Sequence, residues 1–244
     1  RIYAGGVSDF GYLEPDAKGA MRFVSLIDRV PAEARTFGDV WRTHALADGV
    51  YFQSEMALFR WSNGTIRVWK PAVRFNRAAA VNGKLYLTQP GVGLTELVGD
   101  TFRTLPGTEQ LGTETFGVIL PHDDRRILVG TRNNGLLLYD GAALTPFKTE
   151  VDQQIAAHDL YRGTELPDGT VALTTATGGM SIIDRSGRRV ETITKARGLA
   201  ADVVYYAMAD REGWLWLGLG GGIARVDTPS PASFFGEDDG LGAG

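Results

Sequence analysis

The sequence contains no cysteine, which excludes a disulfide framework and any zinc site built on thiolates. No apolar run approaches the roughly 18 residues that a membrane-spanning helix needs. The 25 basic and 29 acidic side chains leave a net charge of −4, so the chain lacks the basic excess that is typical of nucleic-acid-binding proteins. We therefore expect no nucleic-acid partner and no membrane contact by this part of the chain.

Residues with catalytic or metal-binding chemistry are also few. The three histidines, His44, His122 and His158, are not spaced as a metal-binding pair. His44 lies on a predicted inner strand and could line a channel, but we interpret it as structural. The glycines at 218–222 precede a strand rather than a helix, which favours a hairpin over a phosphate loop. We therefore expect no metal, no cofactor and no catalytic residue, although an acid–base pair among the scattered carboxylates remains an alternative.

What the sequence does have is a repeat. Its 244 residues suffice for one large all-β domain. A short hairpin recurs at a period of about 40–45 residues, and most copies follow a turn such as Asp48-Gly49, Asn82-Gly83 or Asp168-Gly169. The matching positions of the six hairpins are Tyr3, Tyr51, Tyr86, Leu128, Ala172 and Trp216.

Further strands are predicted around each hairpin. The second strands are expected at 12–13, 57–61, 93–98, 135–139, 179–183 and 222–226, and third strands at 65–69 and 144–147. Inner strands are expected at 40–46, 78–81, 116–120, 160–165 and 203–209. Helical turns are predicted only within 31–37 and 151–160.

Four short strands per repeat favour a β-propeller over a two-sheet sandwich, because one blade cannot bury both its faces without neighbours. We predict a single propeller domain over 1–244. The first repeat lacks its innermost strand, and 237–241 echo the lead-in at 197–199. We therefore expect a segment of a longer protein, cut within a propeller of about seven blades. Its open edges would close imperfectly or pair with another copy.

The last repeat carries the most specific motif. It contains Gly198-Leu199, Val203, Asp210, Gly213, LWLG at 215–218, Gly222-Ile223 and Arg225. This pattern resembles the two-component regulator propeller repeat, and RILVGTRNNGLLLY at 126–139 is similar to its second half. The chain departs from the family pattern at Gly218-Leu219, where Gly-Thr is usual, and in the missing beginning of the propeller. The match is weak in the fifth repeat, where Ala172 replaces an aromatic residue.

The resemblance implies a periplasmic, non-catalytic sensor domain of a bacterial membrane receptor. In that family a triple-tyrosine domain, a membrane helix and a kinase, cyclase or DNA-binding output usually follow the propeller. It also implies a homodimer in the full receptor. Two alternatives stay open: a lyase or hydrolase that acts on polysaccharides, and a protein-interaction scaffold.

The candidate ligand site lies on the loop face that surrounds the predicted channel mouth. Arg132, Asn133 and Asn134 form its most polar cluster, and a carboxylate beside an exposed aromatic ring is predicted at Asp9 and Phe10. Asp39 and Trp41 enter from the start of an inner strand. Such a group suits a sugar, an oligosaccharide or another polar small molecule. The alternatives are that 133–135 only form a turn and that the tryptophans only pack between blades.

Overall fold

Residues 1–227 are described in a computed structural model, and almost all their regular structure is β-strand. The prediction for 237–241 lies outside the described residues. The chain divides into two units, Arg1–Thr113 and Glu114–Gly244. In both units every sheet is an antiparallel meander of strands that follow one another in sequence. This arrangement confirms the predicted β-propeller class and excludes the two-sheet sandwich.

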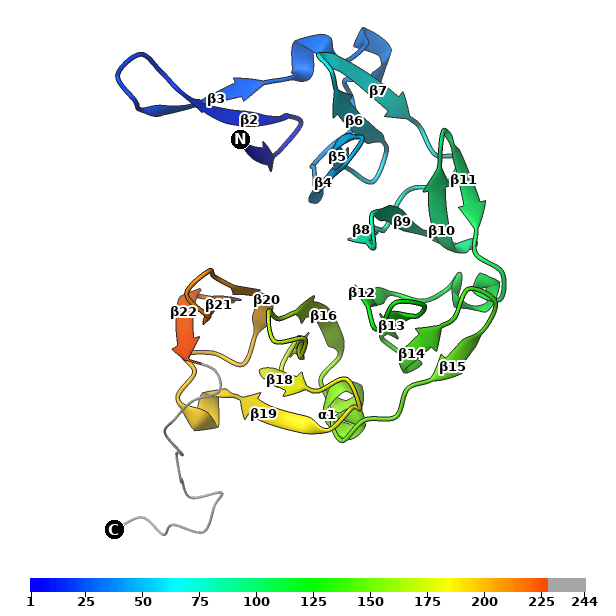
Figure 1. Cartoon of the computed structure of the whole chain (residues 1–244), viewed down its shortest axis with the longest axis vertical. Helices are drawn as coiled ribbons and strands as arrows, with labels where there is room; N and C mark the ends of the chain where they lie inside the picture. The colour runs from blue at the N-terminus through cyan, green and yellow to red at the C-terminus, as the bar shows by residue number, and fades with distance from the viewer. Residues whose placement is uncertain (228–244) are drawn as a thin grey trace. The chain divides into compact units, whose positions relative to one another are not determined.

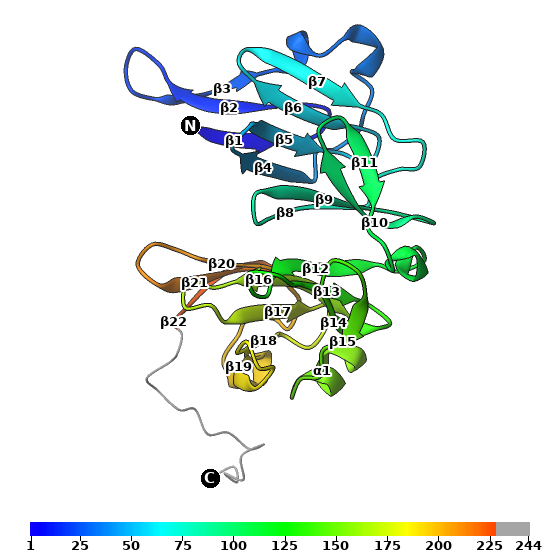
Figure 2. The same ribbon diagram turned by 45° about the vertical axis from the view of Figure 1, so that its right-hand side comes forward.

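Unit 1 contains three sheets (Figures 1 and 2). The first, with three strands, is formed by β1 (Ile2–Gly5), β2 (Phe10–Pro15) and β3 (Met21–Ser25). The second contains β4 (Arg42–Leu46), β5 (Gly49–Gln53), β6 (Leu58–Ser62) and β7 (Thr65–Trp69). The third contains β8 (Arg77–Val81), β9 (Lys84–Gln89), β10 (Gly93–Val98) and β11 (Thr101–Thr104). As predicted, the first sheet lacks an inner strand before the one that holds Tyr3.

Unit 2 also contains three sheets. The first contains β12 (Phe116–Pro121), β13 (Ile127–Thr131), β14 (Gly135–Tyr139) and β15 (Leu144–Pro146). The second contains β16 (Leu160–Glu165), β17 (Val171–Thr175), β18 (Met180–Ile183) and β19 (Arg189–Ile193). The third, with three strands, contains β20 (Val204–Ala209), β21 (Trp214–Leu219) and β22 (Gly222–Asp227). All predicted strands are present. Strands β3, β11 and β19 were not predicted.

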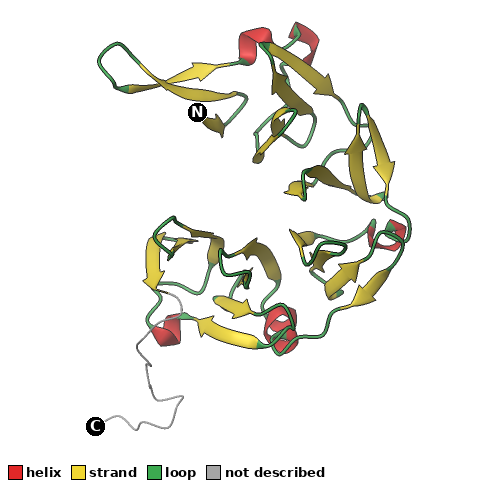
Figure 3. Ribbon diagram, in the orientation of Figure 1, coloured by secondary structure: helices red, strands yellow, loops and turns green. Residues whose placement is uncertain are grey.

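Helical structure is limited to short segments, drawn red in Figure 3. Single 3₁₀ turns are η1 (Ile27–Arg29), η2 (Ala32–Ala34), η3 (Glu109–Leu111) and η4 (Lys195–Arg197), and one α-helix is α1 (Asp152–Ala157). The helical turns predicted within 31–37 and 151–160 are confirmed, but η1, η3 and η4 lie outside these ranges, so the prediction that helical turns occur only there is wrong. None of the described helices has the length and hydropathy that crossing a membrane requires.

Turn chemistry sets the hairpins. Asn63 and Gly64 both have positive φ (49° and 80°), as the type I′ turn of a tight hairpin requires. Asn82 and Gly83 repeat this geometry, with φ of 50° and 75°. These values confirm the predicted turn at Asn82-Gly83 and show the same kind of turn at Asn63-Gly64. The glycines at 220–221 join β21 to β22, which confirms the hairpin interpretation of 218–222.

Central strands such as β5, β13 and β17 bury both faces, which explains their near-continuous apolar sequences. In β5, Phe52 packs into the core shared with the first sheet, while Tyr51 faces the core shared with the third. The interpretation that the tryptophans pack between blades holds only for some of them. Trp69 is buried, whereas Trp41 and Trp216 are exposed. His44 Nε2 lies 3.2 Å from the Ala78 carbonyl oxygen in the neighbouring sheet, a contact that agrees with its structural interpretation.

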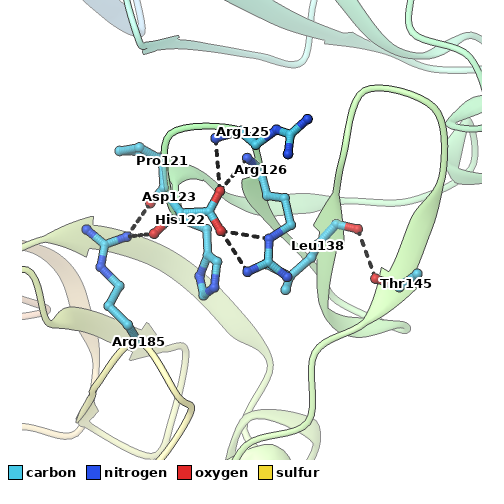
Figure 4. A network of polar contacts seen from close by, with 8 residues as sticks. All are labelled: Pro121, His122, Asp123, Arg125, Arg126, Leu138, Thr145 and Arg185. Atoms are coloured by element: carbon cyan, nitrogen blue, oxygen red, sulfur yellow. Dashed lines mark hydrogen bonds and ion pairs between the residues drawn. The ribbon is translucent and has the colours of Figure 1, made fainter.

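At the turn between β12 and β13, an arginine network joins two neighbouring sheets (Figure 4). The Arg185 guanidinium donates to the carbonyl oxygens of Pro121 (2.8 Å) and His122 (2.6 Å), and it pairs with Glu165. Asp123 accepts from the backbone amides of residues 125 and 126. These contacts fix the position of the β12–β13 turn against the next sheet.

Candidate functional site

The opposite end of β13 carries the polar cluster that the sequence predicted. Residues 132–134 connect β13 to β14, and the Arg132 amide donates to the Thr115 carbonyl oxygen at 3.0 Å. The Asn133 amide nitrogen Nδ2 donates to the Glu114 carboxylate at 3.2 Å. These contacts confirm that the β13–β14 loop shares a face with the lead-in to β12.

An ion pair extends the cluster to the next sheet. Arg132 Nη2 lies 2.6 Å from Asp159 Oδ2, and both side chains are about half exposed (51% and 47%). The hydrogen bond from Arg132 lowers the pKa of the Asp159 carboxyl, and the same bond raises the pKa of Arg132. Asp159 has a φ of 55°, a left-handed conformation that aspartate tolerates better than most residues.

A cavity of about 180 Å³ opens beside this pair. Its floor is apolar, formed by the buried side chains of Leu136, Ile155 and Leu160. Its rim carries Arg132, Lys148 and Asp152. A protein cavity of about 150 Å³ is large enough to bind one benzene molecule. The cavity therefore fits one small polar molecule rather than a long oligomer.

Helix α1 forms one wall of the cavity, and its position is fixed at both ends. The Thr149 hydroxyl donates to Asp152 Oδ1 at 2.6 Å at the start of the helix. From within the helix, Gln154 Nε2 donates to the Gly178 carbonyl oxygen at 3.0 Å and so holds the β17–β18 loop. Beyond the helix, His158 Nδ1 lies 3.1 Å from the Thr177 hydroxyl. The wall is thus anchored to the sheet that follows it.

The other predicted site residues belong to unit 1. Asp9 accepts from its neighbour's amide (2.7 Å) and from the Ser25 hydroxyl (2.6 Å). Asp39 forms a β-bridge with Val7, so the two predicted carboxylates lie on neighbouring loops. Trp41 is 56% exposed. Phe10 is fully buried, so the prediction of an exposed ring is wrong: β2 begins at Phe10 and turns its side chain into the core.

The arrangement in unit 2 combines hydrogen-bond donors, acceptors and an apolar floor. Arg132 and Asn133 supply N–H donors, whereas Glu114, Asp152 and Asp159 supply carboxylate acceptors. Hydroxyl groups donate and accept, so a hydroxyl-rich small molecule matches this surface. Residues 1–227 hold no cluster of three or more histidine and acidic side chains that could bind a metal ion. Asp159 and Asp152 were not predicted as site residues.

Replacing Arg132 with glutamine is expected to raise the pKa of Asp159 towards 3.8, because the charged partner that lowers it is removed. In the wild type, the ion pair of Asp159 stabilises the folded state at pH values above the pKa that Asp159 has in the unfolded chain. This stabilisation is lost as the pH falls through the lower pKa that Asp159 has in the folded protein. A carboxyl NMR titration of both proteins checks this prediction. An unchanged Asp159 midpoint in the variant would contradict the pairing.

Comparison with known proteins places the fold. No protein-family model matches the sequence, and neither does any curated protein. Among solved structures, the WD40 β-propeller domain of Doa1 aligns with 91% of this chain and 73% of its own, with a TM-score of 0.68 and 14% identity. A catalytically inactive virginiamycin B lyase from Staphylococcus aureus, solved with quinupristin, is also similar. The alignment covers 91% of this chain and 75% of the lyase chain, with a TM-score of 0.63 and 17% identity.

A third similar structure is an extracellular domain. It belongs to the putative one-component system BT4673 from B. thetaiotaomicron, and 91% of this chain aligns with 37% of it, with a TM-score of 0.62 and 13% identity. The chain thus spans well under half of that domain. At such low sequence identities, the similarity concerns the fold alone. The three similar proteins, an extracellular domain, a WD40 domain and a lyase, differ in function but share this fold. We conclude that this chain has the β-propeller fold.

Proposed function

We propose that the chain is a ligand-sensing propeller of a bacterial transmembrane receptor, and that it lies on the extracytoplasmic side. The observation that carries the proposal is the Arg132–Asp159 pair beside a small cavity with an apolar floor. The repeat motif in the last sheet supports the receptor context, as does the shared fold with the BT4673 extracellular domain. Ligand binding would bias receptor packing through a coupling free energy.

A catalytic role is less favoured by the electrostatics. Every described carboxylate with a shifted pKa is shifted downwards, as at Asp159, Asp48 and Asp210. A general acid for glycoside cleavage needs the opposite shift, so that it still carries a proton near neutral pH. We therefore propose binding without catalysis, in a receptor that forms a homodimer.

A thermal-shift screen with monosaccharides, disaccharides and small organic acids tests the proposal. A ligand at 100 times its Kd should stabilise the protein by about 2.7 kcal/mol. Calorimetry with any hit should then show that Arg132→Ala weakens binding by about tenfold or more, as expected when a charged hydrogen-bond donor is lost.

The matched control is Arg188→Ala. Arg188 also pairs with an aspartate, Asp184, at 2.9 Å, but in the β18–β19 turn. This variant should bind the ligand as tightly as the wild type does. Equal weakening in both variants, or no hit at all in the screen, would contradict a ligand site at the cavity.

A further inference from the structure

The first strands of the sheets in unit 2 share an irregularity near their starts. The pairing register shifts at Phe116/Val118 in β12, at Leu160/Arg162 in β16 and at Val204/Tyr206 in β20. The first strands β4 and β8 of unit 1 pair without any shift. Bulges of this kind redirect side chains and are frequent next to binding sites.

In two of the three bulges the extra residue is a tyrosine. The rings of Tyr161 and Tyr205 lie with their centroids 5.6 Å apart at an interplanar angle of 60°. The side chains of Tyr205 and Tyr206 are also 50% and 44% exposed. At the third bulge the extra residue is Gly117, where a Cβ would lie 3.1 Å from the Leu160 carbonyl oxygen. The bulges in β16 and β20 therefore bring two tyrosine rings together.

Arg162 lies among these rings, and no residue within 1–227 acts as its counter-ion. Its guanidinium carbon is 4.8 Å from the centroid of the Tyr206 ring. Its Nε atom is buried and has no hydrogen-bond partner, and the ion pairs among residues 1–227 do not include it. Burial lowers the pKa of Arg162, and the charges that act on it come from the tyrosines, not from a carboxylate. A desolvated cation of this kind costs stability until an anion pairs with it.

We propose that Arg162, Tyr161, Tyr205 and Tyr206 form a second binding site for a small carboxylate carried on a flat apolar ring. The guanidinium fork matches both oxygens of a carboxylate, and the tyrosine faces accept a ring. Arg132 at the cavity already has Asp159 as partner. In the part of the chain that the structure describes, Arg162 has no such partner, so its ligand must bring the negative charge. This site goes beyond the proposed sensing cavity and does not depend on it.

Calorimetric titration with benzoate tests the site. Benzoate should bind saturably, and both acetate, which lacks the ring, and benzamide, which lacks the charge, should bind at least about tenfold more weakly. Arg162→Met should weaken benzoate binding by about tenfold or more, whereas Arg188→Ala, in the β18–β19 turn, should leave it unchanged. The proposal is overturned if the wild type does not bind benzoate, or if Arg162→Met binds it normally.

A second measurement needs no ligand. Arg162→Met keeps the apolar stem and removes the unpaired charge, so the melting temperature of the free protein should rise by about 2–4 °C. The control is Arg211→Met, which changes the net charge equally at an exposed turn before β21 and should not shift the melting temperature. A lower melting temperature for Arg162→Met would show that the free protein already satisfies the charge, and it would overturn the proposal.

Discussion

Replacing Phe10 with alanine is expected to destabilise unit 1 by about 3–5 kcal/mol. The Phe10 ring is fully buried, with centroid distances of 4.5 Å to Phe52, 4.8 Å to Phe59 and 5.8 Å to Phe37. Truncation leaves a cavity between rigid rings that cannot collapse to fill it, so the lost contacts are not replaced. Urea unfolding followed by circular dichroism measures the change.

The control is Trp41→Ala in the same unit. Trp41 comes from the same predicted site but is 56% exposed, so its truncation should change the free energy of unfolding by no more than about 0.5 kcal/mol. A result in which the two variants were equally stable would mean that Phe10 is not part of the core.

Gly163→Val should also destabilise the protein, by about 1–3 kcal/mol or more. A Cβ at Gly163 in β16 would lie 2.7 Å and 2.9 Å from the two methyl carbons of Val118 in β12. Val118 is fully buried and has no space into which it can move. Gly130 meets the same side chain from β13 at 2.8 Å. The two strand glycines thus allow β12 and β16 to pack closely, and thermal unfolding checks the effect.

Gly218→Val is the matched control. Gly218 is also a strand glycine of unit 2, in β21, but the nearest atom to its added Cβ would be Tyr206 Cβ at 3.8 Å, an ordinary contact. Because β-branched residues favour strands, this variant should be as stable as the wild type or slightly more stable. If both variants lost the same stability, close packing against Val118 would not be the cause.

The inner strands, such as the little-buried β4, were predicted from their place before each hairpin of the repeat. The central strands were predicted well because their apolar runs, such as ILVGT in β13, follow from burial. The outer strands β3, β11 and β19 were missed for the same physical reason. Their sequences, MRFVS, TFRT and RVETI, are mostly exposed and carry no apolar pattern that would mark a strand. Their pairing depends on the neighbouring strand rather than on their own residues.

Only the locally polar part of the candidate ligand site in unit 2 was predicted from the sequence. Arg132 and Asn133 stand out as a charged and polar loop, and the repeat places Glu114 on their face. The partner Asp159 is 27 residues from Arg132 in sequence, and no spacing rule connects them. Phe10 was misjudged because one residue more or less in the preceding turn decides which face its ring takes. Arg162 was overlooked because its surroundings depend on bulges that leave no mark in the sequence.

The meander order of the strands has a consequence for how the chain acquires its structure. Within residues 1–227, every strand pairs only with strands that precede or follow it directly in sequence. Most pairings therefore close short loops, which keeps the contact order low and favours fast local steps. Because a sheet buries its faces only against its neighbours, folding should spread from sheet to sheet within a unit, as in repeat proteins. Damage to one sheet should then slow the assembly of its immediate neighbours more than that of distant ones.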